Sequence, residues 1–446
     1  MLTPAIVVSS YTMGLGVIRG LGSMGVPVVV VRYDRHDMGH VSRYVREVID
    51  APHPEASEDR FVDLLLEEGD RLRGSLLVPA SDAALAAMSR NKDALSEKYV
   101  VAATEWEISR RFIEKKHTYA LAEEVGVPAP QTTIPRSLED VERYAASAMF
   151  PCLVKPSQGH LYKARFGTKM ERVDDLDELV TAYRRADDAG LEVMLQEIIP
   201  GPDGDGANYN SYTWDGNPAI EFTARKIRGS PPVFGSPRVA LSEIVPEVVE
   251  PGRRILQAMG FYGFSCTEFK RDERDGVWKL MEVNGRHNLS SLLAVRCGVN
   301  FPWIQYRHLV EGELPRVRGQ RTGLYWIDLV RDLGCDVAYA GREPYRLRDY
   351  LRPYQRPHVF AIADLHDPAP FAVRIADLGR TAISAARARL RRSSRRGDIE
   401  PGDQRSRPSG RSGGEVHRSV PGGPLGTTAG GGGDAQRPIR SRAREA

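Results

Sequence analysis

Two runs of alternating apolar and polar residues, 264–270 and 278–286, constrain the fold more than any other part of the chain. The stretch between them is polar and reaches Gly276, which is typical of a tight turn. Strict alternation is the pattern of a strand that buries one face. The two runs therefore predict an antiparallel hairpin.

The hairpin predicts a metal site. Side chains two residues apart share one face of a strand, which places Glu282, Asn284 and Arg286 together, and a neighbouring strand can bring Glu268 beside them. Two carboxylates and an amide oxygen are hard ligands, and an adjacent arginine suits a metal that carries phosphates. We predict Mg²⁺ at Glu268, Glu282 and Asn284, with Mn²⁺ as an alternative. A solvated strand face with unrelated charges is the competing interpretation.

Glu268 followed by Glu282-Val-Asn284-Gly-Arg286 resembles the metal-binding end of the ATP-grasp superfamily, where E-x-N-x-R closes the catalytic domain. The resemblance covers about residues 1–315. Most members are carboxylate–amine or carboxylate–thiol ligases that activate a carboxylate as an acyl phosphate. The resemblance implies ATP and Mg²⁺ as cofactors, and it implies that Arg286 stabilises the transferring phosphoryl group or the tetrahedral oxyanion.

The first part of the chain alternates strand and helix patterns. An apolar run at 5–8 leads through a glycine-bearing turn into a helical pattern, and a second apolar run follows at 26–31. The glycines do not complete the G-x-G-x-x-G form, so dinucleotide binding is only weakly indicated. We predict a Rossmann-like parallel α/β domain at residues 1–105, which matches the domain that precedes the catalytic part in the family.

A two-subdomain ATP-grasp domain is expected at residues 106–318, with a lid subdomain at about 136–200. The resemblance implies that Lys116, ahead of a G-V-P-A-P segment, and Lys155, at the end of an apolar strand, reach the nucleotide phosphates. Lys155 is partly desolvated by that strand, which is costly unless an anion faces it. The alternative interpretation is that Lys116 is an exposed lysine on a helix. The lid loop at 157–167 has only two glycines, which departs from the family.

The apolar strand that ends near residue 199 corresponds to the hinge of the family. The resemblance implies that the segment with Gln196, Glu197 and Ile199 holds the adenine. Asp203, just beyond, could accept hydrogen bonds from ribose hydroxyls, or serve only in a turn.

Three cations, Arg225, Lys226 and Arg228, follow one another on a predicted strand. Such close cations repel one another unless anions neutralise them, so we assign them, with Arg286, to the triphosphate or a substrate carboxylate. The polar loop at 287–291 could reach the acceptor.

The cysteines and the apolar runs of the sequence limit the classes of protein to which the chain can belong. Four cysteines without C-x-x-C spacing argue against a zinc site or a disulfide framework. No apolar run approaches the roughly 18 to 20 residues of a membrane span, and the start of the chain has no signal-peptide pattern, so a cytoplasmic protein without a transmembrane segment is expected.

Residues 319–392 are expected to form a C-terminal extension without a chemical signature, and 393–446 a disordered basic tail. The pattern of residues 376–392 predicts a basic amphipathic helix. This helix is expected to be solvated, and the alternative is that it lies on a membrane surface. From residue 391 onward 12 arginines stand against 6 acidic residues, a net +6, but no aromatic residue accompanies them, which argues against nucleic-acid binding.

Together these features predict an ATP-dependent carbon–nitrogen ligase. Its partners would be a small-molecule carboxylate, of an amino acid or small peptide, and an amine, with ADP and phosphate released; a homo-oligomer is possible. The alternatives are a biotin-dependent-carboxylase-like enzyme of the same family and a non-catalytic nucleotide-binding or scaffold protein.

Overall fold

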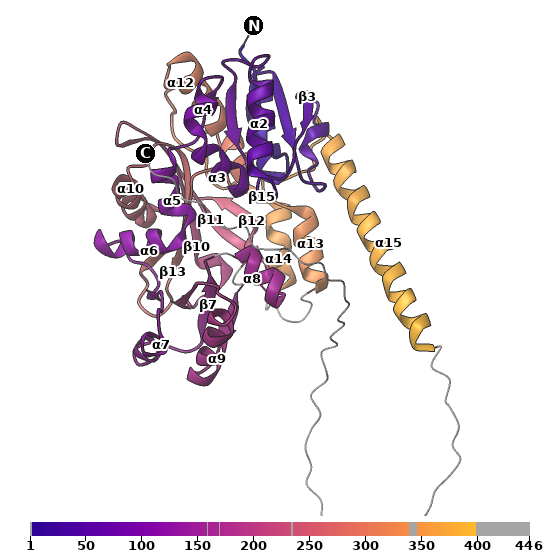
Figure 1. Cartoon of the computed structure of the whole chain (residues 1–446). Helices are drawn as coiled ribbons and strands as arrows, with labels where there is room; N and C mark the ends of the chain where they lie inside the picture. The colour runs from indigo at the N-terminus through magenta and orange to yellow at the C-terminus, as the bar shows by residue number, and fades with distance from the viewer. Residues whose placement is uncertain (1, 158, 169, 233–234, 339–345, 398–446) are drawn as a thin grey trace, which may run out of the picture. The chain divides into compact units, whose positions relative to one another are not determined.

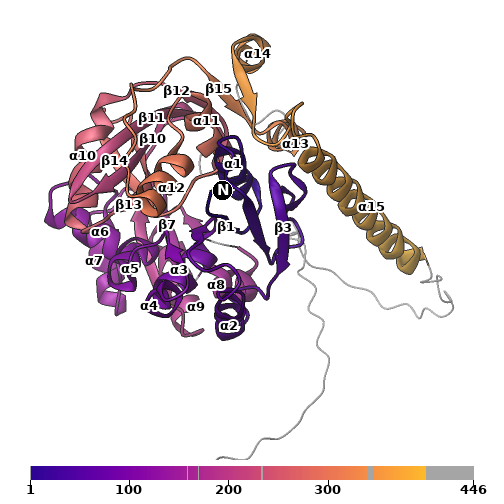
Figure 2. The ribbon, with the colours of Figure 1, turned by 90° about the horizontal axis from the view of Figure 1, so that it is seen from above.

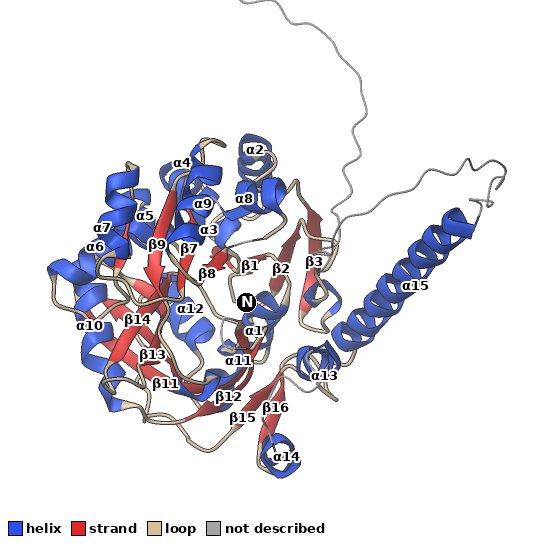
Figure 3. Ribbon diagram, turned by 90° about the horizontal axis from the view of Figure 1, so that it is seen from below, coloured by secondary structure: helices blue, strands red, loops and turns tan. Residues whose placement is uncertain are grey.

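The computed structural model describes residues 2–157, 159–168, 170–232, 235–338 and 346–397. Residues Met1–Ala385 form one compact unit, and Ala386–Ala446 form a second, of which only the end of one helix is described. The predicted disordered tail therefore lies outside the described residues, apart from 393–397. Figure 1 labels the helices and strands, and Figure 3 distinguishes them by colour.

The N-terminal part contains a parallel sheet, as the sequence predicts. The sheet has five strands in the order β3-β2-β1-β4-β5. Its central strand is apolar and fully buried because helices cover both faces of such a sheet. The strands are β1 (Ala5–Val8), β2 (Val28–Arg32), β3 (Val45–Asp50), β4 (Leu76–Pro79) and β5 (Val100–Val101). The helical segments are α1 (Thr12–Gly22), η1 (Gly39–Val41), α2 (Glu58–Glu68), α3 (Asp82–Arg90) and α4 (Lys92–Ser96).

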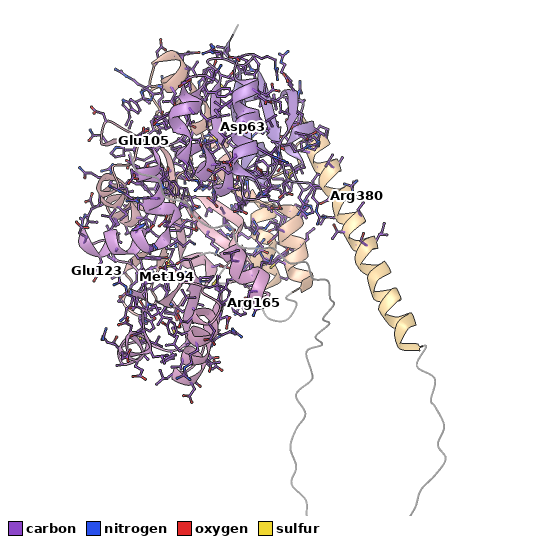
Figure 4. The ribbon with its side chains drawn as sticks, in the orientation of Figure 1. Asp63, Glu105, Glu123, Arg165, Met194 and Arg380 are labelled. Atoms are coloured by element: carbon purple, nitrogen blue, oxygen red, sulfur yellow. The ribbon has the colours of Figure 1, made fainter. Side chains whose placement is uncertain are left out.

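A second, four-stranded sheet has the order β6-β9-β7-β8 and packs one face on helices. Ser137 caps one of these helices by accepting a hydrogen bond from the Asp140 amide. The strands are β6 (Thr132–Thr133), β7 (Cys152–Pro156), β8 (Glu171–Val173) and β9 (Val193–Glu197). The helices before and within this part are α5 (Trp106–Ile113), α6 (Lys115–Glu124), α7 (Leu138–Ala145), α8 (Gly159–Phe166) and α9 (Leu176–Asp187); Figure 4 labels Met194 on β9 and Arg165 on α8.

The largest sheet has seven strands in the order β14-β13-β10-β11-β12-β15-β16, antiparallel except for the last pair. The predicted hairpin is β13 and β14, which lie at one edge. The strands are β10 (Gly206–Trp214), β11 (Asn217–Ser230), β12 (Ser236–Ser242), β13 (Gly263–Arg271), β14 (Trp278–Asn284), β15 (Tyr325–Ile327) and β16 (His358–Phe360). Helical segments of this part are η2 (Asp203–Asp205), η3 (Pro246–Val248), α10 (Val249–Ala258), α11 (Ser291–Arg296) and α12 (Phe301–Glu311).

The C-terminal segment is built into the other parts. It supplies β15 and β16 to the largest sheet, together with α13 (Leu329–Ala338), α14 (Leu347–Gln355) and α15 (Ala369–Gly397). Arg19 of α1 forms a buried ion pair with Asp367 at 3.0 Å and donates to the carbonyls of Ala361 and Ile362. This segment is therefore fixed to the N-terminal sheet as well.

Helix α1 connects the N-terminal sheet to the largest one. It packs against α11 and α12, beside which it lies in Figure 2. The approach is close because Gly16 has no side chain: a Cβ there would lie 2.7 Å from Ser291 Oγ. No helix of the described segments is long and apolar enough to cross a membrane.

Candidate active site

One cavity, of about 220 Å³, brings together residues from the four-stranded sheet, the hinge that follows it and the β13–β14 hairpin. Eight of the thirteen residues that the sequence singled out line this cavity: Lys155, Gln196, Glu197, Ile199, Asp203, Lys226, Glu268 and Glu282. Lys115, Met170 and Met281 also line it. Cations, carboxylates and apolar side chains thus share one cleft between two sheets.

Two carboxylates face each other across the hairpin. Glu268 and Glu282 are direct cross-strand partners, and Asn284 Nδ2 donates a weak hydrogen bond to Glu268 Oε1 at 3.4 Å. Burial, and then the charge of Glu282, raise the pKa of Glu268 to about 7. Like charges directly opposite each other are destabilising, and a divalent cation would remove that repulsion.

The donor set therefore fits the predicted metal. Two carboxylates and one amide oxygen are hard ligands of the kind that Mg²⁺ takes together with phosphate oxygens. No group of three or more His, Cys, Asp and Glu side chains in the described part of the chain is arranged to hold a metal ion. The set Glu268, Glu282 and Asn284 has only two carboxylates, which leaves coordination positions for a substrate.

The cation that approaches Glu282 is Lys115. Its Nζ lies 2.9 Å from Glu282 Oε1, and the charge of Glu282 raises the pKa of Lys115. Burial by itself would raise the pKa of Glu282, but Lys115, Arg286 and Lys155 together lower it. Two charges in this part of the cleft thus stabilise each other.

Lys116, which the sequence predicted to reach the phosphates, is placed elsewhere. It forms an ion pair with Glu192 at 3.1 Å and lines a different cavity. The reason is the phase of α6, in which Tyr119 and Ala122 are buried. Lys115 lies on the same side of the helix as these two residues, because it precedes them by four and seven positions. The buried positions of α6 are therefore the signal that distinguishes Lys115 from Lys116, and the sequence interpretation missed it.

Lys155 carries an unusually desolvated ammonium group. It donates to Gln196 Oε1, and it forms no ion pair with any carboxylate of the described residues. Burial, and then the nearby charge of Lys115, lower the pKa of Lys155 to about 8. An anion in the cleft would stabilise this charge.

Asp203 is already engaged by protein groups. It is 6% exposed, lies 2.8 Å from Lys226 Nζ and accepts a hydrogen bond from the Gly229 amide at 2.8 Å. Lys226 also donates to the carbonyl of Gly235 at 2.6 Å. The predicted ribose contact is therefore not favoured, and Asp203 instead holds Lys226 at the cleft.

The other two cations of this strand do not reach the cleft. Arg225 forms an ion pair with Glu243 at 3.1 Å and lies over the Trp278 ring. Arg228 is 1% exposed and contacts Asp332 at 2.6 Å. The register of β11 shifts on both sides of Arg228, and such bulges re-aim side chains, so alternation along the strand misplaced it.

Arg286 connects the hairpin to the N-terminal sheet. Its guanidinium makes two contacts with the Asp82 carboxylate, at 2.7 and 2.9 Å, and Asp82 begins α3 at the carboxyl end of β4. The Asp82 charge raises the pKa of Arg286 against the effect of burial. Arg286 is thus held at the boundary between two parts of the structure, outside the residues that line the cavity.

Five buried polar atoms from the start of α1 and from residues 287–291, which follow Arg286 in the sequence, have no hydrogen-bond partner among the described residues. The atoms are Ser10 Oγ, Thr12 Oγ1, His287 Nδ1, Asn288 Oδ1 and Ser291 Oγ. They come from the start of α1 and from the loop before α11, two elements in contact. Buried polar groups are rarely left unsatisfied, so this polar cluster is a candidate place for a ligand or ordered water. The sequence indicated the loop but gave no signal for Ser10 and Thr12.

Comparisons with known proteins find relatives in sequence and in fold. No protein-family model matches the chain. It is 25% identical over 248 residues to a D-aspartate ligase of Enterococcus faecium (strain Aus0004), covering 52% of this chain and 58% of that one. It is also 25% identical over 328 residues to a D-alanine–D-alanine ligase of Pseudomonas entomophila (strain L48), covering 66% and 85%. The chain thus spans little more than half the length of the first of these relatives.

Solved structures share the fold. An L-amino acid ligase from Bacillus licheniformis superimposes with a TM-score of 0.55 at 18% identity, covering 70% of this chain and 77% of that one. A biotin carboxylase from Campylobacter jejuni gives 0.56 at 14% identity, covering 72% and 74%. These likenesses concern the fold, and the cleft between two sheets with a Glu-x-Asn hairpin at its edge is consistent with them. In sequence and fold, the chain resembles the ATP-grasp superfamily.

Proposed function

We propose that the protein is an ATP- and Mg²⁺-dependent ligase that joins a carboxylate to an amine through an acyl phosphate and releases ADP and phosphate. The observation that carries the proposal is the single cavity in which the desolvated Lys155 ammonium and the Glu268–Glu282 carboxylate pair meet. A cationic wall opposite two carboxylates suits a polyphosphate together with a divalent cation.

A free carboxylate is a poor acyl donor because an amine that attacks it would have to expel an oxide. The proposed reaction therefore phosphorylates the carboxylate first. A carboxylate oxygen attacks the γ-phosphorus of ATP, the bond to the bridging oxygen breaks, and ADP leaves. The amine then attacks the acyl carbon, a carbon–nitrogen bond forms, phosphate departs and the nitrogen loses a proton. Lys155 and Lys226 would hold the phosphates in line, while Glu268, Glu282 and Asn284 would hold Mg²⁺, which when bound supplies positive charge to phosphate oxygens.

The substrates we propose are amino acids or small peptides. The relatives named as D-aspartate ligase and D-alanine–D-alanine ligase support this class. So do the buried hydroxyl, amide and imidazole groups without partners at the start of α1 and in residues 287–291, because such groups can pair with the ammonium and carboxylate of an amino acid. A cytoplasmic location and a homo-oligomer remain predictions.

A decisive experiment measures ADP release by the full chain with MgATP and pairs of amino acids or small peptides, with mass spectrometry of the product. We expect ADP and phosphate in equal amounts with an amide product. Stoichiometric AMP would contradict the acyl-phosphate route. Product formation only with bicarbonate and biotin would support the carboxylase alternative, and nucleotide binding without turnover on any pair would support the scaffold alternative.

A further inference from the structure

The first turns of α15 pack on the protein through apolar as well as polar side chains: Phe371 and Val373 contact the hydrophobic core. His36 Nδ1 lies 2.8 Å from Asp377 Oδ2, and the Arg374 guanidinium lies over the Tyr11 ring at 5.7 Å. Arg374 and Asp377 are only 14% and 18% exposed. Polar groups of these turns are therefore partly buried against the protein.

Further along the same helix, three large apolar side chains face solvent. Ile375, Leu378 and Ile383 are 47%, 36% and 54% exposed, and at 3.6 residues per turn they lie within one side of the helix. Arg380, at the margin of this side, is labelled on α15 in Figure 4. We call Ile375, Leu378 and Ile383 the outer apolar face.

The sequence adds a strong positive charge to this helix. Helix α15 runs to Gly397, and its remaining turns, 385–397, contain six arginines and no acidic residue. A helix that combines an apolar face with many arginines is the kind that lies in the interface of a membrane.

We propose that α15 docks the protein on an anionic lipid surface, with the outer apolar face entering the boundary between headgroups and acyl chains. Charge complementarity selects this occupant. A second copy of the helix would bring two arginine-rich segments together, and a nucleic acid would neutralise the arginines but leave Ile375, Leu378 and Ile383 in water. The proposal does not depend on the reaction at the cleft.

The test is vesicle flotation of the full chain with phosphatidylcholine alone or mixed with about one third phosphatidylglycerol, at low and high salt. We expect binding to the anionic vesicles only, weakened by salt because screening reduces the attraction. The triple variant Ile375→Ser, Leu378→Ser and Ile383→Ser should bind about tenfold or more weakly, since it loses three apolar side chains. Its thermal midpoint and ATP-dependent turnover should equal those of the wild type.

A matched control replaces three exposed apolar residues elsewhere, as Ile244→Ser, Val277→Ser and Leu314→Ser, and should bind vesicles like the wild type. As a direct measure of burial, the tryptophan added by Ile383→Trp should shift its emission to the blue with anionic vesicles only. No vesicle binding, or equal binding by the triple variant, would overturn the proposal. So would self-association of the full chain that the triple variant abolishes without any effect of lipid.

Discussion

Protonation of Lys155 should control nucleotide affinity at alkaline pH. Burial and the neighbouring Lys115 lower the pKa of Lys155 to about 8 in the free protein. A bound polyphosphate stabilises the charged form and raises this pKa, so the nucleotide prefers the protonated protein. The sign follows: affinity for MgADP falls as pH rises above about 8.

The size of the effect can be worked from that value. At pH 8 about half of the free protein carries the Lys155 ammonium, and at pH 9.5 about 3% does. If only this fraction binds well, the apparent Kd rises about 15-fold over the interval. Glu268, with a pKa of about 7, is mostly ionised throughout the interval and contributes little to the slope.

Calorimetric titration with MgADP between about pH 8 and 9.5 measures this slope. Lys155→Arg should bind at pH 8 and lose the slope, because a guanidinium stays charged over this range. Lys155→Met should bind weakly at every pH. The reasoning is refuted if Lys155→Met retains the affinity of the wild type and the same dependence on pH.

Three further predictions concern the hairpin, the buried ion pairs and the tail. Glu282→Gln should lower turnover at least about 100-fold with little change in MgADP affinity, because charge held at the metal matters most as the phosphoryl bond breaks; steady-state kinetics and titration separate the two effects. Asp332→Asn should lower the free energy of unfolding by roughly 3 to 5 kcal/mol in a denaturant titration, because it removes the carboxylate between the buried Arg228 and Arg238. A chain that ends at Arg392 should keep its thermal midpoint and turnover; loss of either would show that the remaining residues pack on the folded part.

The hairpin and the parallel sheet could be predicted because their signals are local. Alternation along 264–270 and 278–286 indicates one face of each strand, and the structure has Glu268 opposite Glu282, next to a shift of register. The N-terminal strands are apolar on both faces, which is the pattern of a buried parallel sheet. Local patterns of this kind fix which side chains share a face.

Other contacts depended on features outside such patterns. Arg228 is turned away by shifts of register that leave no mark in the alternation of β11. Arg286 is paired with Asp82, 204 residues away, and no local signal specifies that partner. Lys115 is the exception, because the helical phase of Tyr119 and Ala122 could have distinguished it from Lys116.

The pairing of Arg19 with Asp367 has a consequence for how the chain folds. The two residues are 348 positions apart, and the side chains are 3% and 2% exposed. During synthesis, Arg19 cannot receive its partner until nearly the whole folded part has left the ribosome, and closing so long a loop is slow. The N-terminal sheet should therefore reach its final stability late, and a chain that stops before residue 361 would leave the Arg19 guanidinium without the acceptors that residues 361–367 supply.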